Sequence, residues 1–357
     1  HAMVNLSQLL HDFWLEYWPH IALVLSLVIS IPTAIHAAMN KKEVRAAIGW
    51  VGIILLSPFA GSILYIIAGV NRVRQTQISE LRDKQIKEYI NYYTPVVTKL
   101  RQQFDEHLEA LQTLGNQISY FQLRSGNHIQ LLQGGDEAYP AMLDAIHQAE
   151  HSIALQSYIF DNDRIGQQFV DALVQAKQRG VRVRVLIDAI GVRYSHPPVH
   201  RLLRKHGITC ALFMSIPLLP LSFFKRPYAN LRSHRKILIV DGRIAFTGGM
   251  NIREGFCSEF THNKPAKDTH FSFQGPVVLQ LMSTFAHDWE FTTNETLNYD
   301  FWCACTWDTP LPQVPARCVR SGPDRFLAST HSMLQGAFAV AQRHIRIQSP
   351  YFLPDQV

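Results

Sequence analysis

The chain has 357 residues, a formal net charge of +6 and 47% hydrophobic residues. This length is enough for two domains. Its five cysteines are odd in number and form no C-x-x-C pair, which argues against a disulfide framework or a zinc site and fits a reducing compartment. The spacing of Cys303 and Cys305 leaves a redox pair open beside the reading as two ordinary thiols.

Two uncharged apolar runs occupy the amino-terminal part, at residues 19–39 and 46–70. A bilayer core of about 30 Å needs about 20 such residues per helix, so both runs predict a two-helix transmembrane hairpin. Pro32 and Pro58 fall inside the runs, where neighbouring helices and local adjustments can accommodate them. The alternative for the first run is a cleaved signal peptide, but the run is long for one and no basic region precedes it.

The basic residues around the hairpin favour one orientation. Five lysines and arginines follow the second run within residues 72–87, against three in the connecting loop at 41–45. By the positive-inside rule, the large carboxy-terminal part is expected in the cytoplasm. Residues 75–118 are polar and mixed in charge, which predicts a helical connector, either solvated or lying along the membrane surface.

From about residue 128, short apolar strands alternate with helices. Strands are expected at 128–132, 152–160 and 181–188, and amphipathic helices at 139–151 and 167–178. Alternating elements of this kind predict an α/β fold with a mixed sheet that helices cover on both faces.

An H-x-K-x4-D motif follows, made of His234, Lys236 and Asp241. If residues 235–240 form a strand, its alternation places His234 and Lys236 on one face, side by side. An imidazole can form a covalent intermediate with a phosphoryl group, and a neighbouring ammonium can neutralise the charge that develops on the oxygens. This combination predicts chemistry at a phosphodiester.

A small-residue turn stands behind the motif. Gly248 and Gly249 would let backbone N–H groups approach phosphoryl oxygens, and the Asn251 amide could donate a further hydrogen bond. The whole run at 230–252 resembles bacterial cardiolipin synthases of the phospholipase D superfamily.

The resemblance implies a membrane-tethered phosphatidyltransferase with phospholipase D-like lobes. Such an enzyme joins two phosphatidylglycerol molecules into cardiolipin and releases glycerol, through a phosphatidyl-histidine intermediate. It implies an anionic phospholipid substrate in the bacterial inner membrane, no nucleic acid, and no metal or other cofactor, since Lys236 supplies the cation. A homo-oligomer, in which two copies complete one site, stays open.

The resemblance also implies roles for single residues. His234 is expected to be the nucleophile, or else the acid, while Lys236, Gly248, Gly249 and Asn251 bind the phosphoryl oxygens. Asp241 completes the catalytic motif, with anchoring of the strand–turn geometry as its alternative role. Asp268 is the candidate for fixing the tautomer of His234, against the alternative of an ordinary surface carboxylate. Asp288-Trp289 resembles a family pair expected to pack its helix.

The chain repeats part of itself. Residues 153–160 recur as 345–352, and Gln348 lies 192 positions after Gln156. The same offset would put a second H-x-K motif near position 426, beyond residue 357. The expected domains are a hairpin at 1–74, the connector at 75–118, a first lobe at 119–312 and the opening of an incomplete second lobe at 313–357.

Three alternatives stay open at this point. The basic, apolar segment at 223–228 suits contact with anionic lipid, or is a buried loop with two exposed charges. A hydrolase of the same superfamily, acting on lipid or nucleic acid, is the second function considered, although a membrane hairpin disfavours a nuclease. A catalytically incomplete lipid-binding membrane protein is the third.

Overall fold

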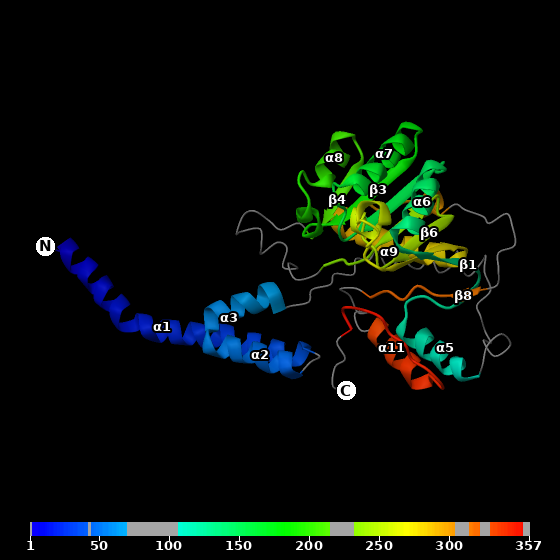
Figure 1. Ribbon diagram of the computed structural model, residues 1–357. Coiled ribbons are helices and arrows are strands. Elements are labelled where there is room, and N and C mark those ends of the chain that lie inside the picture. Colours follow the sequence, from blue (N-terminus) through cyan, green and yellow to red (C-terminus); the bar gives the residue numbers. More distant parts are fainter. Residues whose placement is uncertain are drawn as a thin grey trace. The chain divides into compact units, whose positions relative to one another are not determined.

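The computed structural model describes residues 2–41, 44–69, 106–214, 232–303, 314–321 and 329–352 (Figure 1). The chain divides into two compact units, one holding residues 1–72 and 216–231 and the other holding 73–215 and 232–357. The segment at 223–228 and most of the expected connector at 75–118 lie outside the described residues.

One helix of the amino-terminal unit is long and apolar enough to cross a membrane. It is the stretch Phe13–Asn40 of α1 (Ala2–Asn40), and Pro19 and Pro32 lie inside α1 without ending it. Its apolar side chains are largely exposed in the chain by itself, as expected of a helix whose solvent is lipid. The first of the two predicted spans therefore forms as one helix.

The second apolar run does not form one continuous helix. α2 (Val44–Leu56) ends before Ser57, and α3 (Pro58–Leu64) begins at Pro58 and leads into the π-helical turn η1 (Tyr65–Gly69). Proline lacks an N–H and disfavours helical backbone in the residue before it, and Ser57 accordingly has φ of −140°. The 13 residues of α2 rise about 20 Å, which is short of a bilayer core.

The hairpin shape is nevertheless present within this unit, because α2 and α3 both pack on α1. Tyr65 lies at the centre of this packing, with its hydroxyl 2.9 Å from Nδ1 of His36 and its ring edge-on to Trp50. Lys41 Nζ donates to the carbonyl of Gly69 at 2.5 Å. These contacts hold the end of the second run against the end of α1.

An eight-stranded mixed sheet forms the second unit, in the order β4-β3-β2-β5-β6-β7-β1-β8. Pairing is parallel between β2, β3 and β4 and antiparallel elsewhere. The strands are β1 (Arg124–Gln133), β2 (Ser152–Ser157), β3 (Arg182–Asp188), β4 (Thr209–Phe213), β5 (Ile237–Val240), β6 (Ile244–Gly248), β7 (Thr269–Gln274) and β8 (Val314–Ala316).

Helices cover both faces of this sheet, so the predicted fold class is confirmed. Leu238 and Val240 of β5 belong to the core under α6, α7 and α8, while Ile237 and Ile239 belong to the core under α9. A strand that is apolar on both sides is what a sheet with two covered faces requires. The helices are α6 (Gly134–His147), α7 (Arg164–Gln178), α8 (Val199–Lys205) and α9 (Pro276–Thr293).

The boundaries differ from the predicted ones where local caps and turns intervene. The helix expected from residue 167 begins at Arg164, because the Asp163 side chain accepts from the N–H of Gly166 at 2.8 Å and caps it. The strand expected at 152–160 ends at Ser157, and the following residues turn away to build the site described below.

The second copy of the repeat is only partly formed. Its helix, α11 (Ser329–Val340), is present and packs beside α5 (His107–Ile118) (Figure 1). Residues 345–352 form no strand, and their side chains are exposed. The segment thus differs from β2, whose sequence it repeats, because backbone N–H and C=O groups form a strand only against a neighbour, and no described strand pairs with this segment.

Candidate active site

The segment that carries the motif enters the middle of the sheet. β5 lies between β2 and β6, and residues 232–236 lead into it. The strand is shorter than predicted, since it starts at Ile237 rather than at residue 235. Successive side chains of an extended segment point to opposite sides. Residues 233–236 therefore have two sides: an anchored side with Ser233 and Arg235, and an open side with His234 and Lys236.

The anchored side carries Ser233 and Arg235. The buried Gln156 side chain donates from Nε2 to Oγ of Ser233 (2.8 Å) and to Oδ2 of Asp288 (2.7 Å). Arg235 forms an ion pair with the same Asp288 carboxylate. Burial alone would raise the pKa of Asp288, but the Arg235 charge holds that pKa well below its usual range. This buried network fixes the backbone on both sides of His234.

His234 and Lys236 lie together on the open side. The imidazole stacks on the ring of Tyr158, with 4.0 Å between centroids and 15° between planes. Lys236 Nζ lies 5.7 Å from the centre of the same ring and donates to the His234 carbonyl at 2.7 Å. Tyr158 thus positions both groups, and sequence reasoning had not singled it out.

The imidazole is held in its neutral form. Burial lowers the pKa of His234, the Lys236 charge lowers it further, and Asp188 opposes both effects. Asp188 ends β3, and its carboxylate accepts from the backbone N–H of Ser233 (3.1 Å) and of Ile190 (2.9 Å). The lowered pKa favours the neutral imidazole, in which a ring nitrogen is available as a nucleophile.

Asp268 lies beside Lys236 and Gly249. Burial lowers the pKa of Lys236, and the charge of Asp268 opposes that shift. The carboxylate also fills the space where a Cβ at Gly249 would stand. The fixing of the His234 tautomer by Asp268 stays a prediction, whereas Asp188 is the carboxylate whose charge acts on His234.

The Gly248–Gly249 turn leaves space for the side chains of His270 and Asp268. The N–H of Gly249 donates to the carbonyl of Thr269 at 3.2 Å, so this group is not presented to a substrate. A Cβ at Gly248 would stand 2.6 Å from Nδ1 of the buried His270. Burial and the charge of Lys236 lower the pKa of His270 to about 4. The expected phosphate contact through the Gly249 backbone is therefore not supported by this geometry.

Asp241 serves as an anchor. Its carboxylate accepts from the backbone N–H groups of Glu150 (2.9 Å), His151 (2.8 Å) and Ser152 (2.7 Å). Five residue steps separate it from Lys236, roughly 16 Å along an extended chain. These contacts support the alternative role of Asp241 as an anchor of the start of β2, and a catalytic role for it stays a prediction.

Asn251 joins two loops at the open side. Its Oδ1 accepts from the N–H of Ile159 at 3.0 Å, and its carbonyl accepts from the Tyr139 hydroxyl at 2.6 Å. With Oδ1 engaged in this way, Nδ2 is the group of the amide that can donate to a phosphoryl oxygen.

Metal-binding clusters and disulfides are absent from the part of the chain that the structure describes. No three or more His, Cys, Asp or Glu side chains gather there in a group that could hold a metal. The four described cysteines form no disulfide.

Comparison with known families agrees with this arrangement. Residues 142–289 match the phospholipase D-like domain of cardiolipin synthase, and residues 28–69 match the phospholipase D-nuclease N-terminal family. The chain therefore contains a phospholipase D-like domain. That domain is of the cardiolipin synthase type.

Curated relatives extend the similarity beyond the domain. A Bacillus subtilis protein named "Probable cardiolipin synthase YwiE" is 28% identical over 86% of this chain and 60% of its own length. A cardiolipin synthase of Geobacillus thermodenitrificans is 27% identical over 98% of this chain and 69% of its own. This chain thus spans about two thirds or less of the relatives that it matches.

Among solved structures, the phospholipase D family member Nuc from Salmonella typhimurium is 21% identical, with a TM-score of 0.35 over 48% of this chain and 98% of that one.

Proposed function

We propose that this chain belongs to a phosphatidyltransferase that joins two phosphatidylglycerol molecules into cardiolipin and releases glycerol. The observation that carries the proposal is the open side of the β5 segment. There a neutral His234 and the cation Lys236 stand together over Tyr158, on a backbone that a buried network holds. The match of residues 142–289 to the cardiolipin synthase domain supports the choice of substrate.

In the first step, a ring nitrogen of His234 attacks phosphorus of one phosphatidylglycerol. The P–N bond forms and the P–O bond to the head-group glycerol breaks, so the lipid is held as a phosphatidyl-histidine. The leaving glycerol oxygen takes a proton from a general acid. We assign this acid to the histidine of a second H-x-K motif, which a second copy of the chain would supply in the assay below, or else the second lobe that the repeat predicts.

In the second step, a head-group hydroxyl of another phosphatidylglycerol attacks the same phosphorus. Its proton passes to the group that acted as acid, the P–N bond breaks, and His234 is restored. Lys236 and Nδ2 of Asn251 would hold the non-bridging oxygens, whose negative charge grows in both transition states. Asp268 keeps Lys236 charged by opposing the effect of burial on its pKa.

The amino-terminal unit would tether the enzyme to its lipid. We propose that α1 and the α2–α3 segment place the chain in the bacterial inner membrane as a multi-pass protein. The excess of basic residues after the second run supports a cytoplasmic catalytic region.

One observation favours hydrolysis as the second candidate. The side chain of His234 is exposed in this chain, so water could reach a phosphatidyl-histidine and yield phosphatidic acid. Transfer requires that water be excluded from this position.

The test is the product formed from labelled phosphatidylglycerol vesicles by the purified chain and by His234→Ala. Cardiolipin with an equal amount of glycerol, absent in the variant, supports transfer, and phosphatidic acid supports hydrolysis. The lipid profile of cells that produce each form is measured in parallel. If both profiles and both products are the same with and without the His234 side chain, the enzymatic proposal fails.

A further inference from the structure

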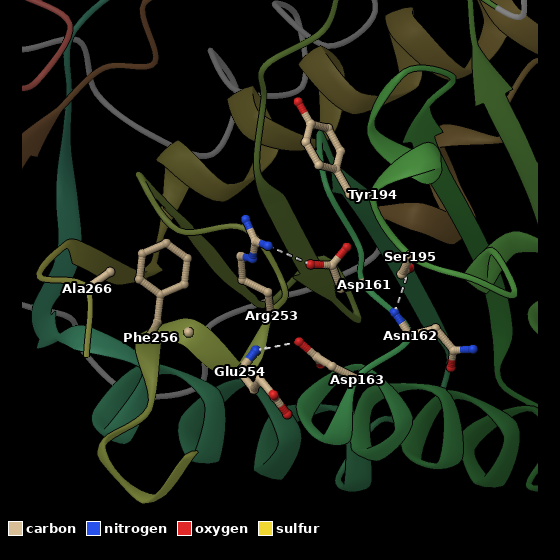
Figure 2. A pocket seen from close by; sticks show the side chains of 10 residues that line it. Asp161, Asn162, Asp163, Tyr194, Ser195, Arg253, Glu254, Phe256 and Ala266 are labelled. Atoms are coloured by element: carbon tan, nitrogen blue, oxygen red, sulfur yellow. Dashed lines mark hydrogen bonds and ion pairs between the residues drawn. The ribbon is translucent and has the colours of Figure 1, made fainter. Parts of the chain in front are cut away.

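A hollow of about 510 Å³ is lined by residues that follow β2 and by residues that follow Asn251. Three segments form its walls: the turn after β2, the end of the 3-10 helix η3 (Gly191–Tyr194), and the loop after β6 that follows Asn251. Figure 2 shows the side chains that line it, chiefly Asp161, Asn162, Tyr194, Ser195, Arg253 and Phe256. Its volume lies in the range of small-molecule sites.

Two aromatic rings connect this hollow to the catalytic imidazole. Tyr158, which stacks on His234, has its pKa raised by burial and by the adjacent Tyr194. Tyr194 in turn lines the hollow. A phosphodiester held at His234 and Lys236 would therefore have this hollow next to its substituents.

The walls of the hollow are tied together by backbone contacts. The N–H of Asp161 donates to the carbonyl of Ile252 at 3.0 Å, and the N–H of Glu254 donates to Oδ2 of Asp163 at 2.7 Å. The carbonyl of Tyr158 fills the space where Gly191 would carry a Cβ. A site with walls fixed in this way is largely formed before a ligand arrives.

Asp161 is the side chain whose bonding is incomplete. It is 5% exposed, and its Oδ2 lies 3.1 Å from the guanidinium of Arg253, but Oδ1 is buried without a hydrogen-bond partner. Figure 2 shows it between Arg253 and Tyr194. A buried acceptor without a donor is costly and uncommon. Asp161 lines the hollow, so a donor bound there is the candidate partner for this carboxylate.

The other two carboxylates of the hollow already have partners. Asp163 caps α7 and accepts from Glu254 N–H, and the Glu254 carboxylate pairs with Arg164 at 2.8 Å. Three carboxylates against Arg253 leave the lining with an excess of negative charge, which disfavours a phosphate or another anion. Hydroxyl groups suit it, since they donate to a carboxylate and accept from a guanidinium.

We propose that this hollow binds the glycerol head group of phosphatidylglycerol, a neutral diol, with Asp161 accepting from one of its hydroxyls and Arg253 donating to it. The assignment rests on the proposed function, which brings this lipid to His234. It makes Asp161 and Arg253 residues that select the head group. Either the lipid that gives up its phosphatidyl group or the lipid that accepts it can supply this diol.

A binding measurement tests the site without turnover. Glycerophosphoglycerol carries the two free hydroxyls of the head group, and glycerophosphopropanol lacks them. The affinity of each compound is measured for the full chain that carries His234→Ala. The diol is expected to bind about 10- to 100-fold more tightly, as one hydrogen bond to a charged group would give. Adding Asp161→Asn should bring the two affinities to within a few-fold. Arg253→Gln provides a second variant with the same expectation.

Asp171→Asn is the matched control, since Asp171 lies exposed on α7 outside the hollow. It should leave the preference for the diol intact. Equal affinities in the starting chain, or a preference that survives both Asp161→Asn and Arg253→Gln, would overturn the site. Neither result depends on whether the chain makes cardiolipin.

Alcohol release then identifies which lipid supplies the diol. Vesicles that contain phosphatidylglycerol and phosphatidylpropanol in equal amounts are given to the active chain, so that both donors meet the same acceptors. Released glycerol and released propanol are then counted, whether the phosphatidyl group goes to lipid or to water. A glycerol-to-propanol ratio that falls at least about 10-fold in Asp161→Asn assigns the hollow to the donor lipid. A ratio that is unchanged, while the binding preference is lost, assigns it to the acceptor.

Discussion

The two copies of the repeated sequence have different structures. Residues 152–157 form β2, which is buried along its whole length between parallel β3 and antiparallel β5. Residues 345–352 carry the same apolar pattern but are exposed and belong to no ladder among the described residues. The difference teaches that such a pattern specifies which face a strand would bury, while the strand itself forms only where a neighbouring strand supplies hydrogen bonds.

The largest expected effect concerns the chemistry that the first copy supports. His234→Ala removes the proposed nucleophile, which stacks on Tyr158 just after β2, and we expect phosphatidyl transfer to fall by about a thousand-fold or more. His331→Ala, in α11 of the second copy, should leave the rate within about two-fold, because this side chain is exposed. Initial rates on labelled phosphatidylglycerol check both. A His234 variant that keeps a tenth of the rate would contradict the assignment.

A matched pair of core substitutions tests the comparison directly. Ile153 is completely buried and its counterpart Ile345 is 53% exposed. Ile153→Ala should lower the free energy of unfolding by about 2–5 kcal/mol because it leaves a cavity. Ile345→Ala should change it by no more than about 0.5 kcal/mol. Urea unfolding of the 357-residue chain gives both values, and equal losses would show that the second copy is packed.

The glutamines of the two copies form a second pair. Gln156 is buried and joins Ser233 to Asp288, whereas Gln348 is exposed. Gln156→Ala leaves buried polar groups without a donor, at a cost of about 1–3 kcal/mol. Because the anchored side of the motif segment loosens, kcat should fall while KM for the lipid stays. Gln348→Ala should change neither. A loss of stability with an unchanged kcat would reduce Gln156 to a structural residue.

The smallest expected effect is a shift in pH dependence. Transfer needs neutral His234, so the rate should rise with pH through the His234 pKa, which lies below 6.5. The charge of Asp188 raises that pKa, and Asp188→Asn should move the acid limb to lower pH, by less than about one unit for a group that is partly exposed. Rate profiles between pH 4 and 8 check this. A shift to higher pH would contradict the assigned influence of Asp188.

Much of the site follows from the order of residues alone. The H-x-K spacing places His234 and Lys236 side by side because an extended chain alternates, and this holds even though the ladder starts only at Ile237. The partners of these residues come from elsewhere. These partners are Asp188, Tyr158 and Gln156. They reach the motif because β2 is the neighbour of β5 and β3 is the next strand beyond β2, an order that no local spacing specifies.

For two sequence interpretations, the structure shows contacts that the sequence did not predict. The Gly248–Gly249 turn was expected to offer N–H groups, yet Gly249 donates to Thr269 and the missing side chains leave room for Asp268 and His270. Asp241 was counted with the catalytic residues, yet it holds three backbone N–H groups at the start of β2. The glycines leave room for neighbouring side chains, and Asp241 anchors a strand. Both roles depend on segments that are distant in the chain.

The sequence by itself determined the fold class, the first apolar helix, which is long enough to cross a membrane, and the open pair of His234 and Lys236, because hydrophobic periodicity and backbone alternation are local properties. Tertiary structure alone decided which copy of the repeat became a strand, which carboxylate acts on the imidazole, and that a hollow with an unpaired Asp161 oxygen lies beside it. These depend on which segments meet in space, and burial and charge act on a side chain only after they have met.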